Sequence, residues 1–182
     1  MVYPNDWEKV FIAKNGKTIN FRPEKVTDTD MLWKMFSTLS EITVSNLIPP
    51  FTRERIESWT SNIDYDEVLA IVAVTEEENI QRIVGSASLK FNSQKVFKHK
   101  AELGIAVHDD YQKLGIGTAL LNHLLAIAKM KKLKKVGLIV NIKNERAIYM
   151  YRKIGFELEG TLHRELLYKG RYNNLYQMAL LL

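Results

Sequence analysis

The chain has no cysteine among its 182 residues. This excludes disulfide bonds, thiolate metal sites and a covalent mechanism that runs through a cysteine. It also fits a reducing compartment, so we expect a cytoplasmic protein. No run of about 18 apolar residues is present, which argues against a membrane-spanning helix. Residues 1–16 carry early charges and no apolar stretch, so we expect no secretory signal there.

Metal-ligand spacing is lacking as well. The four histidines and the acidic residues form no H-x-H or H-x-x-x-H pattern, and we predict no metal. No repeat, low-complexity segment or linker divides the chain, which predicts a single domain over residues 1–182. A hydrophobic content of 46% and a charged content of 26% suit a globular domain with a substantial core.

The charge balance is basic, with 26 Lys and Arg against 21 Asp and Glu. Much of the excess lies in residues 95–100 and 129–135. A basic chain suits an anionic ligand, large or small, although such runs are also ordinary solvated surface. A nucleic-acid binder is therefore one alternative. Since the runs lack interleaved aromatic residues and no nucleic-acid-binding motif is present, we expect no nucleic-acid partner.

The hydrophobic periodicity predicts one mixed α/β domain in which helices cover a central sheet. Strands are expected at residues 18–26, 67–75, 82–91, 101–108 and 134–141, with two more in the tail joined at residues 169–174. Helices are expected at residues 28–42, from about Thr52, from the glycine pair to about residue 131, and at 144–156.

Gly115 and Gly117 stand between an expected strand and a long expected helix. A strand, a glycine-rich turn and a helix N-terminus make an anion site, because the first amides of a helix have no intrahelical partner. A P-loop would need a lysine before Thr118, and the dinucleotide fingerprint would need a third glycine where Leu120 stands. Taken alone, the pair is either a tight turn or a phosphate site.

The pattern that does match is Q-x-x-G-x-G, formed by Gln112, Gly115 and Gly117. It resembles the acyl-CoA signature of the GNAT superfamily of N-acetyltransferases. The preceding "LGIAVHDDYQ", the downstream "NERAIYMYRKIGF" and the closing "GFELEG" and "YKGRYNNLYQMAL" resemble further segments of that family. The resemblance covers residues 82–182, and the first third of the chain only in the order of its elements.

The resemblance implies a mostly antiparallel central sheet with splayed strands, flanked by about four helices. It implies acetyl-CoA as cosubstrate, with the pantetheine arm held by main-chain groups of Ile105 and Val107 and by Asn144. The amide of Val107 would polarise the thioester carbonyl. The pyrophosphate would lie on the loop made of Gln112, Lys113, Leu114, Gly115, Ile116, Gly117 and Thr118. Lys113 would add a charge contact there, or is simply exposed.

Tyr151 is the candidate general acid. Asn144, Ala147, Ile148 and Tyr151 share one face of the expected helix, a pattern that by itself also fits a core tyrosine. The resemblance places the Tyr151 hydroxyl beside the CoA sulfur. A phenol with a pKa of about 10 can give a proton to a departing thiolate.

Glu102 is the candidate general base. An alkyl amine is neutral in only about one molecule in 2,500 at pH 7, so the attacking amine needs a base. The counterpart of Glu102 serves as base in several family members, often through water; the alternative is a strand-edge glutamate in a surface salt bridge. Ribosomal-protein N-terminal acetyltransferases carry a glutamate where this chain has Ile139, so their mechanism does not transfer.

The sequence thus predicts direct acetyl transfer to a primary amine, with a small-molecule amine or amino acid as acceptor. Protein N-terminal or lysine acetylation and a non-catalytic acyl-CoA-binding module are the alternatives. Acceptor specificity is expected in residues 41–62 and 167–174. His108, Asp109 and Asp110 are expected to form the turn into the loop. A homodimer is one alternative for the assembly.

Overall fold

The computed structural model describes residues 7–182, so the first six residues of the expected non-secretory N-terminus lie outside it. Within this range eight strands form one sheet in the order β1-β2-β3-β4-β5-β6-β8-β7. The strands are β1 (Lys9–Ile12), β2 (Thr18–Pro23), β3 (Val68–Glu77), β4 (Ile80–Phe91), β5 (Lys100–Val107), β6 (Lys135–Asn141), β7 (Glu157–Tyr168) and β8 (Arg171–Leu181). All neighbours are antiparallel except β5 and β6, which are parallel.

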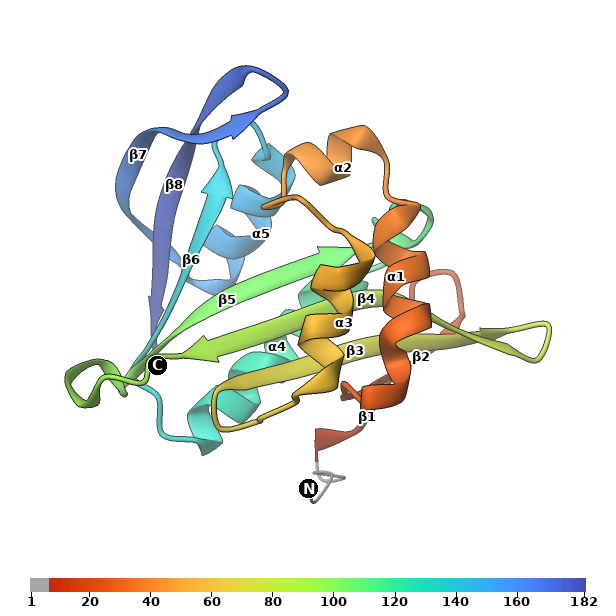
Figure 1. The fold of residues 1–182 in the computed structure, drawn as a ribbon. Helices are drawn as coiled ribbons and strands as arrows, with labels where there is room; N and C mark the ends of the chain where they lie inside the picture. The colour runs from red at the N-terminus through yellow and green to blue at the C-terminus, as the bar shows by residue number, and fades with distance from the viewer. Residues whose placement is uncertain (1–6) are drawn as a thin grey trace.

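Helices cover both faces of the sheet (Figure 1). The α-helices are α1 (Thr29–Ser37), α2 (Glu41–Ser45), α3 (Arg53–Ser61), α4 (Ile116–Met130) and α5 (Glu145–Ile154). Short 3-10 turns lie at Val26–Asp28, Lys95–Phe97 and Asp109–Tyr111. In Figure 1, α1 and α3 lie in front of the sheet and α4 behind it. No helix in residues 7–182 is both long and apolar enough to cross a bilayer.

Each face of the sheet has its own apolar core. Behind it, α4 buries Leu120, Leu121 and Leu124 completely, because its apolar residues recur at helical spacing. In front, α1 and α3 pack a smaller cluster that includes Phe36 and Ile56 against β3 and β4. Neither α1 nor α3 makes its main contacts with β6, β7 or β8, so that part of the front face stays open.

The feature that positions the site is the divergence of β5 from β6. The two strands pair only from Lys100 opposite Lys135 to Glu102 opposite Gly137. Beyond Glu102, β5 continues to Val107 along β4, whereas β6 continues to Asn141 along β8. The central sheet is therefore splayed, and the expected fold class is confirmed.

Three details differ from the sequence-based expectation. β1 was not expected; its residues are mostly exposed, and it is a strand because it pairs with β2. The helix expected at residues 28–42 is two helices, because Ser40 is extended and caps the first turn of α2. The closing hairpin turns at Lys169 and Gly170 alone, both with positive φ, so the residues from Arg171 onward belong to β8.

Candidate active site

The divergence of β5 leaves main-chain groups of this strand open on one side. The amide of His108 donates to the carbonyl of Val84 on β4 at 2.9 Å, and alternate residues of a strand direct their main-chain groups to opposite sides. Ile105 and Val107 therefore direct theirs away from β4, into the gap. Among the described residues no strand pairs with this side of β5 beyond Glu102. An extended amide-bearing ligand could hydrogen-bond there as an added strand would.

The gap leads to the N-terminus of α4. Gly115 is the N-cap residue in the left-handed region at φ 86°, and Lys113 also has positive φ at 65°. Among the described residues no side chain caps this helix, and its first turn carries no acid. Its first amides are thus free for an anion. A Cβ at Gly117 would lie in ordinary van der Waals contact with Val107 and Met150, at 3.5 and 3.8 Å, so this helix start packs between β5 and α5.

These features fit the CoA group that the sequence resemblance implies. The free amides of α4 and its positive helix end suit a diphosphate, and the open side of β5 suits the two amides of a pantetheine arm. The residues expected for this ligand, from Gln112 to Thr118, therefore lie on one continuous loop and helix start next to the gap.

The side chain of Gln112 is hydrogen-bonded to three other parts of the protein. Its Nε2 donates to the carbonyl of Val107 and to Thr43, both at 3.2 Å. Its Oε1 accepts from Arg146 on α5 at 3.0 Å. Both polar atoms of this side chain are thus hydrogen-bonded within the protein. Gln112 therefore connects the end of β5 and the loop to α2 and α5.

The turn after β5 is tied to α2. His108 accepts from the amide of Asp110, as expected for a turn residue, and its other ring nitrogen hydrogen-bonds with Thr38 at 3.0 Å. Asp109 accepts from the amide and hydroxyl of Ser40 at 2.8 and 2.7 Å. Burial opposes ionisation of Asp109, but these hydrogen bonds and one from Thr43 outweigh it and lower the pKa of this carboxyl. Asp109 therefore anchors α2 at the end of β5.

Tyr151 lies on the buried face of α5, 7% exposed. Its hydroxyl has no hydrogen-bond partner among residues 7–182 and is not sealed from solvent. Burial raises the pKa of Tyr151 well above its ordinary value, so the phenol stays protonated at neutral pH. Asn144 caps α5 by accepting from the amide of Ala147 at 3.2 Å through its side-chain oxygen, which leaves its side-chain NH₂ group available to a ligand.

Glu102 lies in an open depression on the front face, where β5 and β6 begin to part. The depression measures about 230 Å³ and is lined by Lys100, Glu102, Lys135, Gly137, Ile139, Glu159 and Gln177. Both carboxylate oxygens of Glu102 lie against Gly137, 3.3 and 3.4 Å from where a Cβ would stand. Glu159 pairs with Lys135 at 2.5 Å, whereas Glu102 has no ion pair or hydrogen bond through its carboxylate with any described residue.

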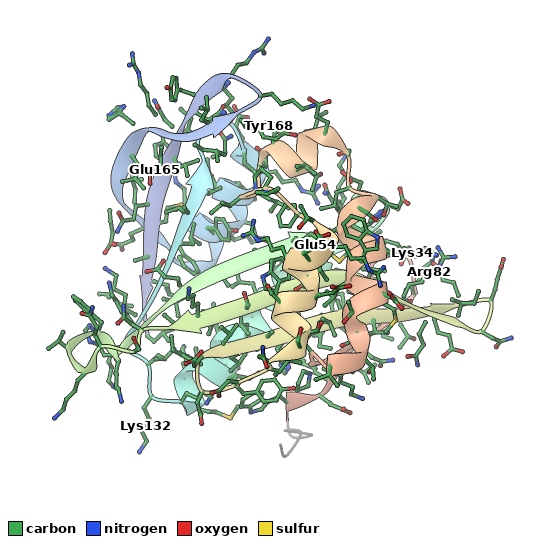
Figure 2. The ribbon with its side chains drawn as sticks, viewed as in Figure 1. Lys34, Glu54, Arg82, Lys132, Glu165 and Tyr168 are labelled. Atoms are coloured by element: carbon green, nitrogen blue, oxygen red, sulfur yellow. The ribbon has the colours of Figure 1, made fainter. Side chains whose placement is uncertain are left out.

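The two segments expected to select the acceptor meet at the top of this face. Lys169 in the turn of the closing hairpin pairs with Glu41 of α2 at 2.7 Å. Asn141, at the end of β6, donates to the carbonyl of Ser45 in α2 at 3.3 Å. Figure 2 shows the hairpin end, marked by Tyr168, beside α2 above the open face. The α2 segment therefore contacts the end of β5 through Asp109 and the β6–β8 side through Asn141 and Lys169, so it connects the two halves of the splayed sheet.

Sequence reasoning missed Gly137, Thr43 and Arg146. A glycine inside the apolar strand "KKVGLIVN" signals a close approach of another group, and this signal was available. Thr43 and Arg146 carried no such signal, because their roles depend on the position of Gln112 in space.

A family model described as the acetyltransferase (GNAT) family matches residues 32–156, more than half of the chain. The L-amino acid N-acetyltransferase AaaT of Escherichia coli (strain K12) is 30% identical over 98 residues, 53% of this chain and 60% of the relative. The spermidine N(1)-acetyltransferase of the same organism is 35% identical over 82 residues, 44% of each chain. The chain thus spans about half the length of these two curated relatives.

A longer match is to the N-alpha-acetyltransferase of Sulfurisphaera tokodaii, 27% identical over 150 residues, 80% of this chain and 84% of the relative. Among solved structures, the GNAT domain of S. lividans PAT superposes with a TM-score of 0.79 at 18% identity, covering 100% of both chains. The yncA acetyltransferase from Salmonella typhimurium, solved with acetyl-CoA, has a TM-score of 0.74 at 18% identity and covers 90% of this chain and 93% of that one.

Proposed function

The chain belongs to the GNAT acetyltransferase family, and from this premise we propose that it transfers an acetyl group from acetyl-CoA directly to a primary amine. Acetyl-CoA supplies the acetyl group as an activated thioester. One domain over residues 1–182 would do this, which the single sheet running from β1 to β8 supports. The lack of cysteine supports a reducing, cytoplasmic compartment.

The observation that carries the proposal is the parting of β5 and β6 directly before the free N-terminus of α4. The main-chain groups of Ile105 and the amide of Val107, whose carbonyl accepts from Gln112, would hold the pantetheine arm. The amides at Lys113 to Thr118 would hold the pyrophosphate, and the amide of Val107 would polarise the thioester carbonyl. Holding the donor in one orientation beside the amine is itself a large part of the acceleration.

Two side chains would move protons. Glu102, whose carboxylate has no partner among the described residues, would accept the proton of the attacking amine directly or through a water. The Tyr151 hydroxyl would donate to the departing sulfur, since burial keeps this phenol protonated at neutral pH. Because the two groups come from opposite faces of the sheet, amine and thioester would meet in the gap between them.

For the acceptor we propose a small-molecule amine or an amino acid. The depression around Glu102 is only about 230 Å³, which suits a small acceptor. The depression is lined by positive and negative side chains, which suits a zwitterion: Lys100, Lys135, Glu102 and Glu159. The similarity to AaaT, named for L-amino acids, agrees with this class.

The test is a panel of amines with acetyl-CoA, read as release of free thiol. The panel holds the amino acids, spermidine and related polyamines, and peptides with a free N-terminus or lysine. The proposal predicts turnover of at least one amine, with amino acids among the acceptors. If no amine in the panel accelerates thiol release over hydrolysis in buffer while acetyl-CoA binds, the chain is a binding module and the catalytic proposal is wrong.

Peptide acetylation is the second candidate, and the match to the N-alpha-acetyltransferase over 84% of that protein favours it. Against it, Ile139 occupies the position of the base that ribosomal-protein N-terminal acetyltransferases use. Turnover of N-terminal peptides with no turnover of free amino acids would replace the first acceptor class by this one.

A further inference from the structure

The turn between β1 and β2, residues 13–17, packs against the loop that precedes α4. The amide of Lys14 donates to the carbonyl of Leu114 at 3.1 Å. Where a Cβ on Gly115 would stand, the nearest atoms are Cζ of Phe11 at 3.4 Å and Cε of Lys14 at 4.0 Å. The side chain of Lys14 therefore runs alongside Gly115, and its ammonium lies close to the N-terminal end of α4.

This is an unfavourable place for a lysine. The N-terminus of a helix carries a partial positive charge, which favours anions and disfavours cations. The first turn of α4 has no acid and no side-chain cap that would offset it. Lys113 adds a second cation at the same end, and among residues 7–182 neither lysine has an anionic partner. An anion bound there would offset the unfavourable interaction of both lysines with the positive end of the helix.

Other cations near this loop are already engaged. Lys17, in the same turn, pairs with Glu77 and lies over the ring of Tyr111. Arg146 donates to Gln112. Within residues 7–182, Lys14 and Lys113 are thus the cations at the start of α4 that have no anionic partner and are available to a ligand.

We propose that Lys14 binds a phosphate of CoA, so that the β1–β2 turn forms one wall of the donor site. This inference rests on the proposed function, because it assumes that CoA lies on the α4 loop. Lys14 comes from a hairpin about 100 residues before the loop, and it acts on affinity for the phosphates rather than on the chemistry at the thioester.

The test is calorimetric titration of CoA at low salt into the unmodified protein, Lys14→Met, the charge reversal Lys14→Glu, and Lys132→Met. Lys132 is the matched control: it is an exposed lysine after the far end of α4, labelled at the lower left in Figure 2. Lys14→Met should weaken CoA binding about three- to tenfold and Lys14→Glu more, while Lys132→Met leaves it unchanged. The difference should shrink as salt is raised.

Two further ligands locate the contact. If the loss persists with dephospho-CoA, Lys14 contacts the diphosphate; if it disappears, Lys14 contacts the 3′-phosphate, and either result supports the proposal. Pantetheine, which has no phosphate, should bind the Lys14 variants and the unmodified protein equally in an NMR titration. An equal loss with pantetheine would show that the substitutions distort the site, and the proposal would be wrong.

The same titrations separate this inference from the proposed function. If the unmodified protein fails to bind CoA, the proposed function itself is contradicted. If it binds CoA and both Lys14 variants bind equally well, only the role of Lys14 is contradicted.

Discussion

At the scale of single residues, the account depends on two side chains whose polar groups have no partner within residues 7–182. Tyr151 is buried and its hydroxyl lacks a hydrogen bond to any described residue, although most buried polar groups in proteins are paired. Glu102 is exposed, and its carboxylate has no partner among the described residues, so it faces solvent in the depression. A group kept free in this way is available to a substrate, and each can be tested separately.

Removing the Tyr151 hydroxyl should lower kcat by more than about tenfold, because the departing sulfur would lose its proton donor. The substitution is Tyr151→Phe, which keeps the ring contact with Phe156 and should leave folding intact. The measurement is thiol release at saturating acetyl-CoA and acceptor. Tyr149→Phe, on the exposed side of the same helix, is the control and should match the unmodified protein. An unchanged kcat in Tyr151→Phe would remove this residue from the mechanism.

Replacing the Glu102 carboxylate by an amide should lower kcat/KM by roughly 10²–10⁴-fold, because an amide cannot accept the amine proton. Glu159→Gln is the control, since Glu159 lines the same depression but is held by Lys135. A kcat/KM in Glu102→Gln equal to that of the unmodified protein would mean that another group is the base.

At the scale of elements, the loop before α4 combines a left-handed glycine with free helix amides. A side chain at Gly115 would force φ 86° on an L-residue, at a cost of about 1–2 kcal/mol, and would touch Phe11. We expect Gly115→Ala to lose about that much stability and to bind CoA at least tenfold more weakly, as when a hydrogen bond to a charged group is lost.

The control Gly170→Ala separates the loss of stability from the loss of CoA binding. Gly170 also has positive φ, 73°, but lies in the turn of the closing hairpin with open space around it. Urea denaturation should show a similar loss of stability in both variants, and calorimetry should show weaker CoA binding in Gly115→Ala alone. Equal CoA affinity in the two variants would mean that the loop amides do not bind the ligand.

Elements with strong local patterns could be predicted from the sequence. The strand, glycine pair and helix over residues 101–131 were predicted, because apolar periodicity and turn residues indicate the same elements there. β1 was not predicted, because Val10 and Ile12 are 64% and 58% exposed and this segment is a strand only through its pairing with β2. The contacts of Lys14 with Leu114 and of Glu102 with Gly137 depend on the register of distant strands, which local patterns do not specify.

At the scale of the whole molecule, stability should depend on pH through a buried acid far from the site. Glu24 is 4% exposed. Burial, and secondly the charge of Asp28, raise the pKa of Glu24 to about 7, against a smaller opposing effect of Arg22. The folded protein therefore keeps a proton that the unfolded chain releases above about pH 4.3.

The difference in pKa between the folded and unfolded states sets the direction of the pH dependence. Stability is greatest below the unfolded pKa and falls as pH rises through the folded pKa of about 7. The free energy of unfolding should drop by roughly 2–3 kcal/mol between pH 5 and 8 from this group. Urea denaturation of Glu24→Gln should lose that slope, whereas the exposed Glu78→Gln should keep it. Equal slopes in Glu24→Gln and the unmodified protein would contradict the assignment.

The central claim is that CoA lies in the gap between β5 and β6, with its diphosphate on the start of α4 and its sulfur near Tyr151. A crystal structure of the complex with CoA tests this most directly. We predict phosphate oxygens within hydrogen-bonding distance of amides between Lys113 and Thr118, and the sulfur within reach of the Tyr151 hydroxyl. CoA bound elsewhere, or a Tyr151 hydroxyl pointing away from the sulfur, would contradict the account.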